Sequence, residues 1–398
     1  MLEIQGKRNT ALIYADKIEK EAKRQIAEIL REEGYSHSKI RIMPDVHAGK
    51  TVPIGTTMTI TDRVSPALVG VDIGCGIDTV FFEDKSVDFK ELDGFIHANI
   101  PAGSDIRETP FDNEIASLLD ELCCRDVIDH DGTLRSIGTL GGGNHFIEID
   151  VDSKGRHALV IHSGSRRLGC DVAMHYQRLA YKYQCKKAMR SHKSVSRSKY
   201  GDDEFFTKGH KREMKAGPGV KFEYAMLEGE LFSMYMHDIR LVQIFAQYNR
   251  NAIAETICRG MSFDVTEGFT CRHNFIDERS MILRKGAISA KLGESVIIPL
   301  NMRDGAILGT GLGNPDWNYS APHGAGRICS RGDAAHAYTV EEYREQMSGV
   351  YSTTVTKETL DECPMAYKPM DRILDFISET VKVDEIIKPV YNFKATNN

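Results

Sequence analysis

The stretch ALVGVDIGCGIDTVFFE, residues 67–83, is the starting point for reading this chain. Its apolar residues are interrupted by glycines, a pattern that predicts two buried strands around a tight loop. Asp72 lies inside this run, and a buried carboxylate is costly unless a cation or a hydrogen-bond donor meets it. Cys75 taken alone would be interpreted as a small buried hydrophobe. Together, Asp72 and Cys75 indicate a metal site.

Helical and strand-like segments follow one another on both sides of this run. Helices are expected at residues 14–33, 111–124, 170–185 and 224–259. A strand is expected at residues 40–43, loop-and-strand units at 140–152 and 157–167, and strands again within 280–313. No repeat of roughly 20–50 residues is visible, so the sequence does not indicate a repeat protein.

The composition is that of a globular chain of 398 residues, with 51 Lys and Arg against 57 Asp and Glu, a net charge of −6. This length allows either two or three domains or one large domain. The absence of an apolar run of about 18 residues excludes a coded membrane span. The N-terminal residues are too charged for a signal peptide, and none of the nine cysteines forms a C-x-x-C pair. A cytoplasmic protein with reduced thiols is therefore expected.

Charge is not spread evenly along the chain. Residues 186–199, KKAMRSHKSVSRSK, contain six Lys and Arg and no acidic residue. One interpretation is an exposed loop on an insertion, and the other is a surface that contacts nucleic-acid phosphates. The net negative charge argues against a protein that coats nucleic acid generally, but it leaves room for a local basic groove.

Five loops combine glycine with histidine, aspartate or asparagine, a composition that suits metal or phosphate sites. They lie at residues 45–50, 72–76, 141–145, 162–166 and 323–327. His145 and His162 each stand at a strand end, where a structural histidine and a metal ligand are equally consistent with the pattern. His273 has weaker context. His323 begins the run HGAGR, which indicates either an anion-binding loop or a glycine-rich turn.

Standard nucleotide-binding motifs are absent from the sequence. Pro44 stands where a P-loop would need its first glycine before Gly49-Lys50-Thr51. No strand is followed by G-x-G-x-x-G with an acidic residue about 20 positions later. A nucleotide, if one binds, must therefore be held by a less common arrangement.

Taken together, the loops resemble the RtcB family of RNA ligases. The matching segments, in family order, are PDVHAGK (44–50), GVDIGCG (70–76), LGGGNHFIEI (140–149), HSGSR (162–166), RHN (272–274), GNP (313–315), HGAGR (323–327) and DECPMAYK (361–368), with Lys394 near the C-terminus. The resemblance implies an α+β fold in one large mixed domain over residues 1–398, with β-sheets flanked by helices around a deep dimetal cleft. Residues 186–222 would then be a basic surface insertion.

The resemblance also implies an activity, which is GTP-dependent joining of RNA 3′-phosphate or 2′,3′-cyclic phosphate ends to 5′-hydroxyl ends. Two Mn²⁺ ions would be held, one by Asp72, Cys75 and His145 and the other by Cys75, His162 and His273. His323 would take GMP. The ligand types alone would suggest zinc, and manganese is what the family implies.

Further residues receive roles from the same resemblance. The guanylate site would be lined by Asn144, His145, Phe146, Ile147, Glu148, His273, Asn274, Pro299, Leu300, Asn301, Met302, His323, Gly324, Ala325, Gly326 and Lys394. Arg166 and Arg327 would contact RNA phosphates. An activating protein of the archease type is a possible partner, and a monomer without membrane contact is expected.

Some positions depart from the family pattern. Residues 299–302 read PLNM where most members have PGSM, and residues 320–322 read SAP where SCS is usual. Two other functions stay open: a dimetal cyclic phosphodiesterase that does not ligate, and an RNA-binding protein without catalysis. The retained ligand residues and His323 argue against the second.

Overall fold

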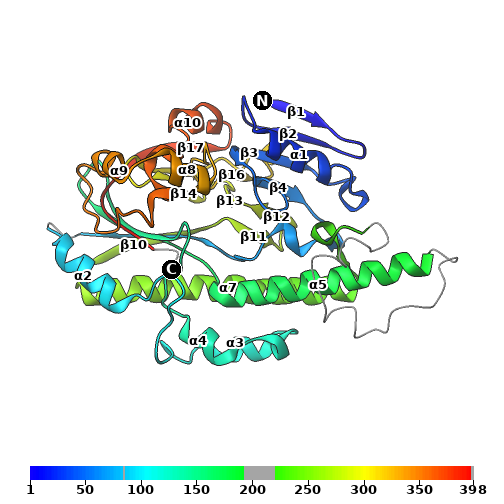
Figure 1. Ribbon diagram of the computed structural model, residues 1–398, viewed down its shortest axis with the longest axis horizontal. Coiled ribbons are helices and arrows are strands. Elements are labelled where there is room, and N and C mark those ends of the chain that lie inside the picture. Colours follow the sequence, from blue (N-terminus) through cyan, green and yellow to red (C-terminus); the bar gives the residue numbers. More distant parts are fainter. Residues whose placement is uncertain (84–85, 192–219, 396–398) are drawn as a thin grey trace.

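The computed structural model describes residues 1–83, 86–191 and 220–395, and it contains two large sheets (Figure 1). The six-stranded sheet has the order β1 (Leu2–Gln5), β2 (Thr10–Ile13), β3 (Ile40–His47), β4 (Ile54–Thr59), β12 (Ile282–Lys285) and β11 (Asn274–Asp277). The seven-stranded sheet has the order β10 (Val265–Arg272), β6 (Gly76–Phe82), β8 (His157–Ser163), β7 (Phe146–Val151), β17 (Val381–Lys394), β15 (Gly305–Gly311) and β14 (Ser295–Asn301). Two small pairs, β13 (Ala287–Ser289) with β16 (Ser320–Pro322) and β5 (Arg63–Val64) with β9 (Leu227–Glu228), complete the strands described.

Two long helices, α5 (Arg166–Ser191) and α7 (Glu230–Gly260), pack against each other below the sheets in Figure 1. Helix α7 contacts β6 and β8, and its buried residues Ile253 and Ile257 join a core with Phe82, Ile147 and Ile161 of the seven-stranded sheet. The shorter helices are α1 (Lys20–Ile29), α2 (Phe89–Asn99), α3 (Ala116–Glu121), α4 (His130–Arg135), α8 (Arg331–Ala337), α9 (Val340–Gln346) and α10 (Asp371–Ile377). The expected α+β class in one large domain is confirmed. Within the described ranges, no helix is both long and apolar enough to span a membrane.

The run at residues 67–83 forms one strand, so the expectation of two strands is wrong. Pro66–Leu68 is a short 3₁₀ turn, and the chain then loops until β6 begins at Gly76. Gly74 in this loop has a φ of +74°, and a Cβ there would lie 2.9 Å from Cα of Gln243 in α7. The loop therefore turns tightly over helix α7 instead of extending as a strand.

Helix boundaries also differ from the sequence prediction. Helix α1 begins six residues later than Tyr14, because Tyr14 is extended and its amide donates to the carbonyl of Ile42 (2.9 Å). Helix α3 is shorter than predicted, since Asp238 of α7 accepts from the amides of Cys123 and Cys124 just after α3 ends. Helix α5 is longer than predicted and continues through Ser191.

The basic segment is therefore helical where it begins, and its first six residues, 186–191, are not a loop. Residues 192–199 lie outside the described residues, as does most of the insertion expected at 186–222. At its far end, Val220 and Phe222 are partly buried against the core.

Candidate functional site

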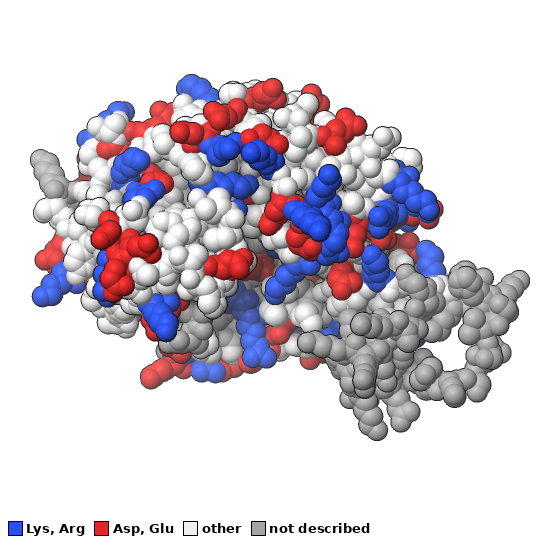
Figure 2. Space-filling model, turned by 45° about the horizontal axis from the view of Figure 1, so that its top comes forward, with Lys and Arg blue, Asp and Glu red and all other residues white. Residues whose placement is uncertain are grey.

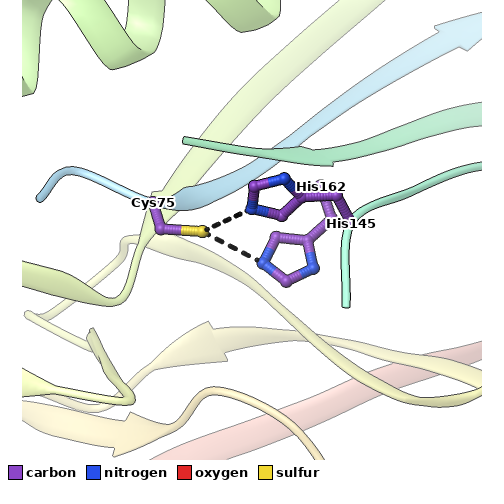
Figure 3. A group of neighbouring side chains, drawn as sticks. All are labelled: Cys75, His145 and His162. Carbon is purple, nitrogen blue, oxygen red and sulfur yellow. Dashed lines mark hydrogen bonds between the residues drawn. The ribbon is translucent and has the colours of Figure 1, made fainter. Parts of the chain in front are cut away.

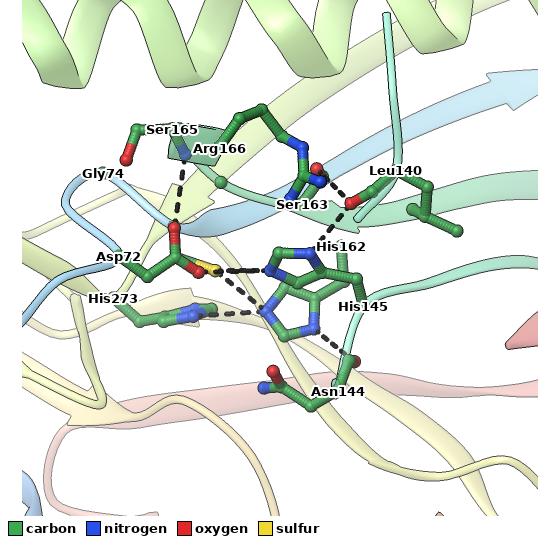
Figure 4. A network of polar contacts seen from close by, with 12 residues as sticks. Asp72, Gly74, Leu140, Asn144, His145, His162, Ser163, Ser165, Arg166 and His273 are labelled. Carbon is green, nitrogen blue, oxygen red and sulfur yellow. Dashed lines mark hydrogen bonds and ion pairs between the residues drawn. The ribbon is translucent and has the colours of Figure 1, made fainter. Parts of the chain in front are cut away.

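Four segments that are distant in sequence bring the predicted metal ligands together (Figure 4). Asp72 and Cys75 lie in the loop before β6, and His145 immediately precedes β7. His162 lies in β8, opposite Ile77 of β6 and Phe146 of β7. His273 lies between β10 and β11. Because β8 pairs with both β6 and β7, the register of this sheet sets the positions of three of these side chains.

Cys75 lies at the centre of the group (Figure 3). Its Sγ is 3.2 Å from Nε2 of His162 and 3.5 Å from Nε2 of His145. Nε2 of His145 is 3.2 Å from Oδ2 of Asp72, and Nε2 of His162 is 3.3 Å from Nε2 of His273. A sulfur, three imidazole nitrogens and a carboxylate oxygen thus converge on one small region.

The orientation of the rings tests whether a metal fits. Nδ1 of His145 donates to the carbonyl of Leu140 (2.8 Å), and Nδ1 of His162 donates to the carbonyl of Asn144 (3.0 Å). In a neutral imidazole the other nitrogen then carries a lone pair. The Nε2 lone pair of His145 therefore faces the carboxylate of Asp72, although both are acceptors. A shared cation resolves this conflict, so the residues fit a metal site.

Burial also favours neutral imidazole rings, which is the form that binds a metal. It lowers the pKa of His162 and of His273 well below the ordinary value, with a further contribution from neighbouring histidines, so both rings are neutral. Burial beside the charge of Asp72 raises the pKa of the Cys75 thiol well above its usual range. A Cys75 thiolate thus requires a cation beside it.

A second cluster, Cys123, His237 and Asp238, also has metal-ligand residue types. The carboxylate of Asp238 accepts from the amides of Cys123 (2.8 Å) and Cys124 (3.1 Å) and from the hydroxyl of Tyr176 (2.7 Å). Nε2 of His237 contacts the carbonyl of Glu121 (3.1 Å). These bonds use the Asp238 carboxylate and Nε2 of His237 to hold the end of helix α3 against α7, so we interpret this cluster as structural.

His323 follows β16 and is paired with Asp45, which lies in β3 two residues before His47. Nδ1 of His323 is 2.6 Å from Oδ2 of Asp45, which also accepts from the His323 amide (3.1 Å). Asp45 is fully buried. The pair fixes the proton on Nδ1 and leaves Nε2 as the free lone pair. The His323 ring is centred 5.0 Å from that of His273, beside the ligand cluster.

These groups share a cleft of about 320 Å³. Of the residues expected at the guanylate site, it is lined by Asn144, Phe146, Glu148, His273, Asn274, Pro299, Leu300, Asn301, Met302, His323, Gly324, Ala325, Gly326 and Lys394. His145 lies against Asp72 and Cys75 instead. Ile147 is on the opposite face of β7, within the core shared with α7, because successive strand residues point to opposite sides.

Comparisons with known proteins identify the family of this chain. The family model described as tRNA-splicing ligase RtcB matches residues 25–129 and 126–395. The chain belongs to the RtcB family. It is 29% identical to the RNA-splicing ligase RtcB of Escherichia coli K12, covering 89% of this chain and 90% of that protein. It is 26% identical to the tRNA-splicing ligase RtcB of Aeropyrum pernix, covering 91% and 90%, and 27% identical to that of Methanococcus maripaludis, covering 85% and 84%.

Several residues that line the cleft of this RtcB family member were not assigned from sequence. They are His47, Lys285, Arg331, Glu362, Tyr367 and Asn392. Asp45 was also missed, although it belongs to one of the five loops singled out. Nothing in the local pattern distinguished Asp45, because its partner His323 is 278 positions away.

Glu362 organises the cations on one wall of the cleft. Its carboxylate meets Lys394 (2.8 Å), Arg331 (2.8 Å) and Arg327 (3.1 Å). Burial acts to raise the pKa of Glu362, but the three cations outweigh it and lower the pKa to about 2. Glu362 is therefore ionised and holds Lys394 in place beside Asn144, whose carbonyl Lys394 also contacts (3.2 Å).

The two arginines expected at RNA phosphates bond to the protein. Arg327 donates to Glu362 and to the backbone carbonyls of Asp361 and Cys329 (3.2 Å to Cys329). Arg166 donates to Thr139 Oγ1 (3.1 Å) and the carbonyl of Gly103 (3.2 Å). A phosphate contact would need to replace or share these partners. Basic and acidic side chains are interspersed on the face in Figure 2, so this face has no broad field of one sign.

Proposed function

We propose that this chain is a GTP- and manganese-dependent RNA ligase that joins an RNA 3′-phosphate or 2′,3′-cyclic phosphate to a 5′-hydroxyl. The observation that carries the proposal is that His323, held by Asp45, lines one cleft with Cys75, His162 and His273. The relatives are named RNA-splicing or tRNA-splicing ligases, which supports an RNA substrate in splicing or repair.

The cluster would hold two Mn²⁺ ions. Asp72, Cys75 and His145 would be the ligands of one ion, and Cys75, His162 and His273 would be the ligands of the other. When bound, the ions would neutralise the triphosphate and the departing pyrophosphate. The contacts of 3.2–3.5 Å that His145 makes with Cys75 and Asp72 support the first site. The second is supported by the 3.2 Å contact of His162 with Cys75 and the 3.3 Å contact between Nε2 of His162 and Nε2 of His273.

In the first step, Nε2 of His323 attacks the α-phosphorus of GTP. The new N–P bond forms as the bond to pyrophosphate breaks, and the electron pair leaves on pyrophosphate. Asp45 keeps the ring proton on Nδ1, so Nε2 is available as a nucleophile. Its carboxylate also balances the positive charge that develops on the ring.

Two further transfers complete the reaction. An oxygen of the RNA 3′-phosphate attacks the phosphorus of the histidine-bound GMP, and the N–P electron pair returns to His323. The 5′-hydroxyl oxygen then attacks the RNA phosphate, the bond to GMP breaks, and a phosphodiester forms. A cyclic end is first opened by water. Lys394, held by Glu362, would contact the guanylate together with Asn144 and Glu148, and the shared cleft that these three residues line supports this assignment.

The test is formation of a labelled adduct. Wild-type protein is incubated with α-³²P-GTP and Mn²⁺ and run on a denaturing gel. His323→Ala should form no labelled adduct and seal no 3′-phosphate end, while Asp45→Asn should form it far more slowly. An adduct on histidine nitrogen should be labile to acid and stable to base. The matched control is His37→Ala, which removes an exposed histidine and should label as wild type does.

Two results would contradict the proposal. One is a labelled adduct that persists in His323→Ala, which would place the nucleophile elsewhere. The other is wild-type protein that opens cyclic phosphates but never labels, which would favour a phosphodiesterase. His323→Ala should still join RNA supplied with a 3′-guanylate cap, because that substrate bypasses the histidine.

A further inference from the structure

Two carboxyl groups lie side by side on one face of β7, behind the cleft. Glu148 and Asp150 are two residues apart in this strand, so their side chains point to the same side. Both are buried, and the two side chains are close enough to share a hydrogen bond. Glu148 lines the cleft, whereas Asp150 lies deeper, beside the cross-strand residue Pro389 of β17.

The partners of the two groups differ. Oε2 of Glu148 accepts from Nδ2 of Asn392 at 2.6 Å. Neither oxygen of Asp150 receives a hydrogen bond from any donor among the described residues. A buried carboxylate without a donor is strongly unfavourable, and two ionised carboxylates in contact are more so. One proton shared by the pair relieves both costs.

Asn392 carries a further buried polar atom without a hydrogen-bond partner among the described residues. Its amide nitrogen is used by Glu148, but its Oδ1 is buried without a donor among the described residues, and the residue lines the cleft. Oδ1 is an acceptor only. Glu148 as a carboxylate and Asn392 Oδ1 are therefore hydrogen-bond acceptors on two neighbouring residues that both line the cleft. A guanine base offers N1–H and an amino group as donors on one edge, whereas adenine presents a bare N1 there.

We propose that Asp150 is a positioning residue of the nucleotide site, which stays a neutral carboxylic acid and donates a hydrogen bond from its O–H group to Glu148. Glu148 is thereby held as a carboxylate that, with Asn392, forms an acceptor edge for guanine. The inference rests on the proposed function, because it assumes that GTP occupies the cleft.

The surrounding charges assign the proton to the deeper residue. Burial raises the pKa of Glu148 to about 7, although Asn392, Asp150 and the cation of Lys394 act to lower it. Burial and the charge of Glu148 raise the pKa of Asp150 well above its usual range, against a smaller effect of Lys388. Glu148 therefore ionises first as pH rises. GTP binding should strengthen as pH rises through about 7, when Glu148 becomes an acceptor.

The test compares Asp150→Asn with Asp150→Leu. Asparagine retains an N–H donor toward Glu148, whereas leucine has a similar volume and no donor. Asp150→Leu should weaken GTP binding by about tenfold or more at pH 7, the scale of one hydrogen bond to a charged group. Its affinity should recover at higher pH than in wild type, because Glu148 has lost the donor that favours its ionised form. Asp150→Asn should bind GTP within about twofold of wild type.

Binding is measured by calorimetry with GTP, ITP and ATP in the presence of Mn²⁺, alongside the manganese content of each variant. ITP lacks the 2-amino group, so wild type should prefer GTP over ITP, and Asp150→Leu should lose part of that preference. Infrared difference spectra supply a readout that is independent of the nucleotide. At a pH well above 7, where Glu148 is ionised, wild type should show the C=O stretch of a buried protonated carboxyl that Asp150→Asn lacks.

Three results would overturn the role of Asp150: equal GTP affinity in Asp150→Leu and wild type, equal losses in the leucine and asparagine variants, or no protonated-carboxyl band. If Asp150→Leu does not fold, the asparagine variant and the infrared band still decide the question. Failure of the proposed function is distinct, because wild-type protein would then bind no GTP and form no labelled adduct.

Discussion

At the scale of single residues, Cys75 lies between the two groups of candidate metal ligands. Its Sγ lies within 3.5 Å of the Nε2 atoms of both His145 and His162. A thiolate can bridge two cations, whereas an alanine methyl can hold neither. Loss of this one atom should therefore affect both proposed metal sites at once.

We expect Cys75→Ala to lower bound manganese at both sites and to abolish labelling by GTP. The loss of affinity should exceed the roughly 10–100-fold cost of removing a residue that only orients a ligand. Elemental analysis of the purified protein gives the stoichiometry. Cys185→Ala is the matched control, because Cys185 is a buried cysteine in α5. Unchanged stoichiometry in Cys75→Ala would refute the bridging role.

At the scale of elements, helix α5 connects the site to the basic segment. It begins at Arg166, four residues after His162, and runs to Ser191. With a rise of about 1.5 Å per residue, Lys186 lies about 30 Å along the axis from Arg166. Lys187 pairs with Glu228 of β9, which anchors this end of the helix. An interaction of the basic segment with RNA would therefore be separate from the chemistry in the cleft.

Replacing Lys186, Lys187, Arg190 and Lys193 with alanine should weaken RNA binding if these residues bind phosphates. The slope of log affinity against log salt should fall by about 0.7 for each phosphate of a single strand that the variant no longer neutralises. Labelling by GTP should persist. Filter binding at several salt concentrations measures the slope, and an unchanged slope would identify the segment as a solvated surface.

At the scale of the whole molecule, Arg250 ties α7 to the loop that carries the metal ligands. Its side chain is fully buried and bonds to Asp78 of β6 (2.8 Å), to the carbonyl of Gly74 (3.0 Å) and to the carbonyl of Ser163 (3.1 Å). Gly74 immediately precedes Cys75, and Ser163 follows His162. One guanidinium thus connects a helix, a strand and two ligand segments.

Arg250→Met should lower the free energy of unfolding by about 3–5 kcal/mol, because it leaves the buried carboxylate of Asp78 without its cation. Denaturant unfolding of the metal-free protein measures this loss, and manganese affinity should fall with it. Arg259→Met is the control on the same helix, since Arg259 pairs with Glu255 at the surface and is 80% exposed. Its loss should be at most about 1 kcal/mol. Equal losses in the two variants would contradict the role of Arg250.

Local sequence alone was sufficient for the features that depend on neighbours in the chain. Strands β7 and β8 were predicted from apolar runs next to glycine-rich loops, and the family was identified from ordered motifs. Asp72 and Cys75 indicated a metal site from their own segment, whereas His145, His162 and His273 were assigned to metals through the resemblance to the family. The helix boundaries at Tyr14 and near Asp238, and the tight loop at Gly74, were less predictable, since these residues contact segments that lie far away in the chain.

Only the tertiary structure decided which distant groups meet. Asp45 contacts His323, which is 278 positions away in the chain, and Glu362 forms an ion pair with Lys394 in the wall of the cleft. The proton shared by Asp150 and Glu148 depends on what β17 and the core leave unpaired, which no local pattern records. The sequence by itself determined which residue types the site contains, and therefore which metal-binding and nucleophilic groups it offers. The structure determined their pairing, because sheet register, burial and the partner of each buried polar atom arise only when the chain is packed.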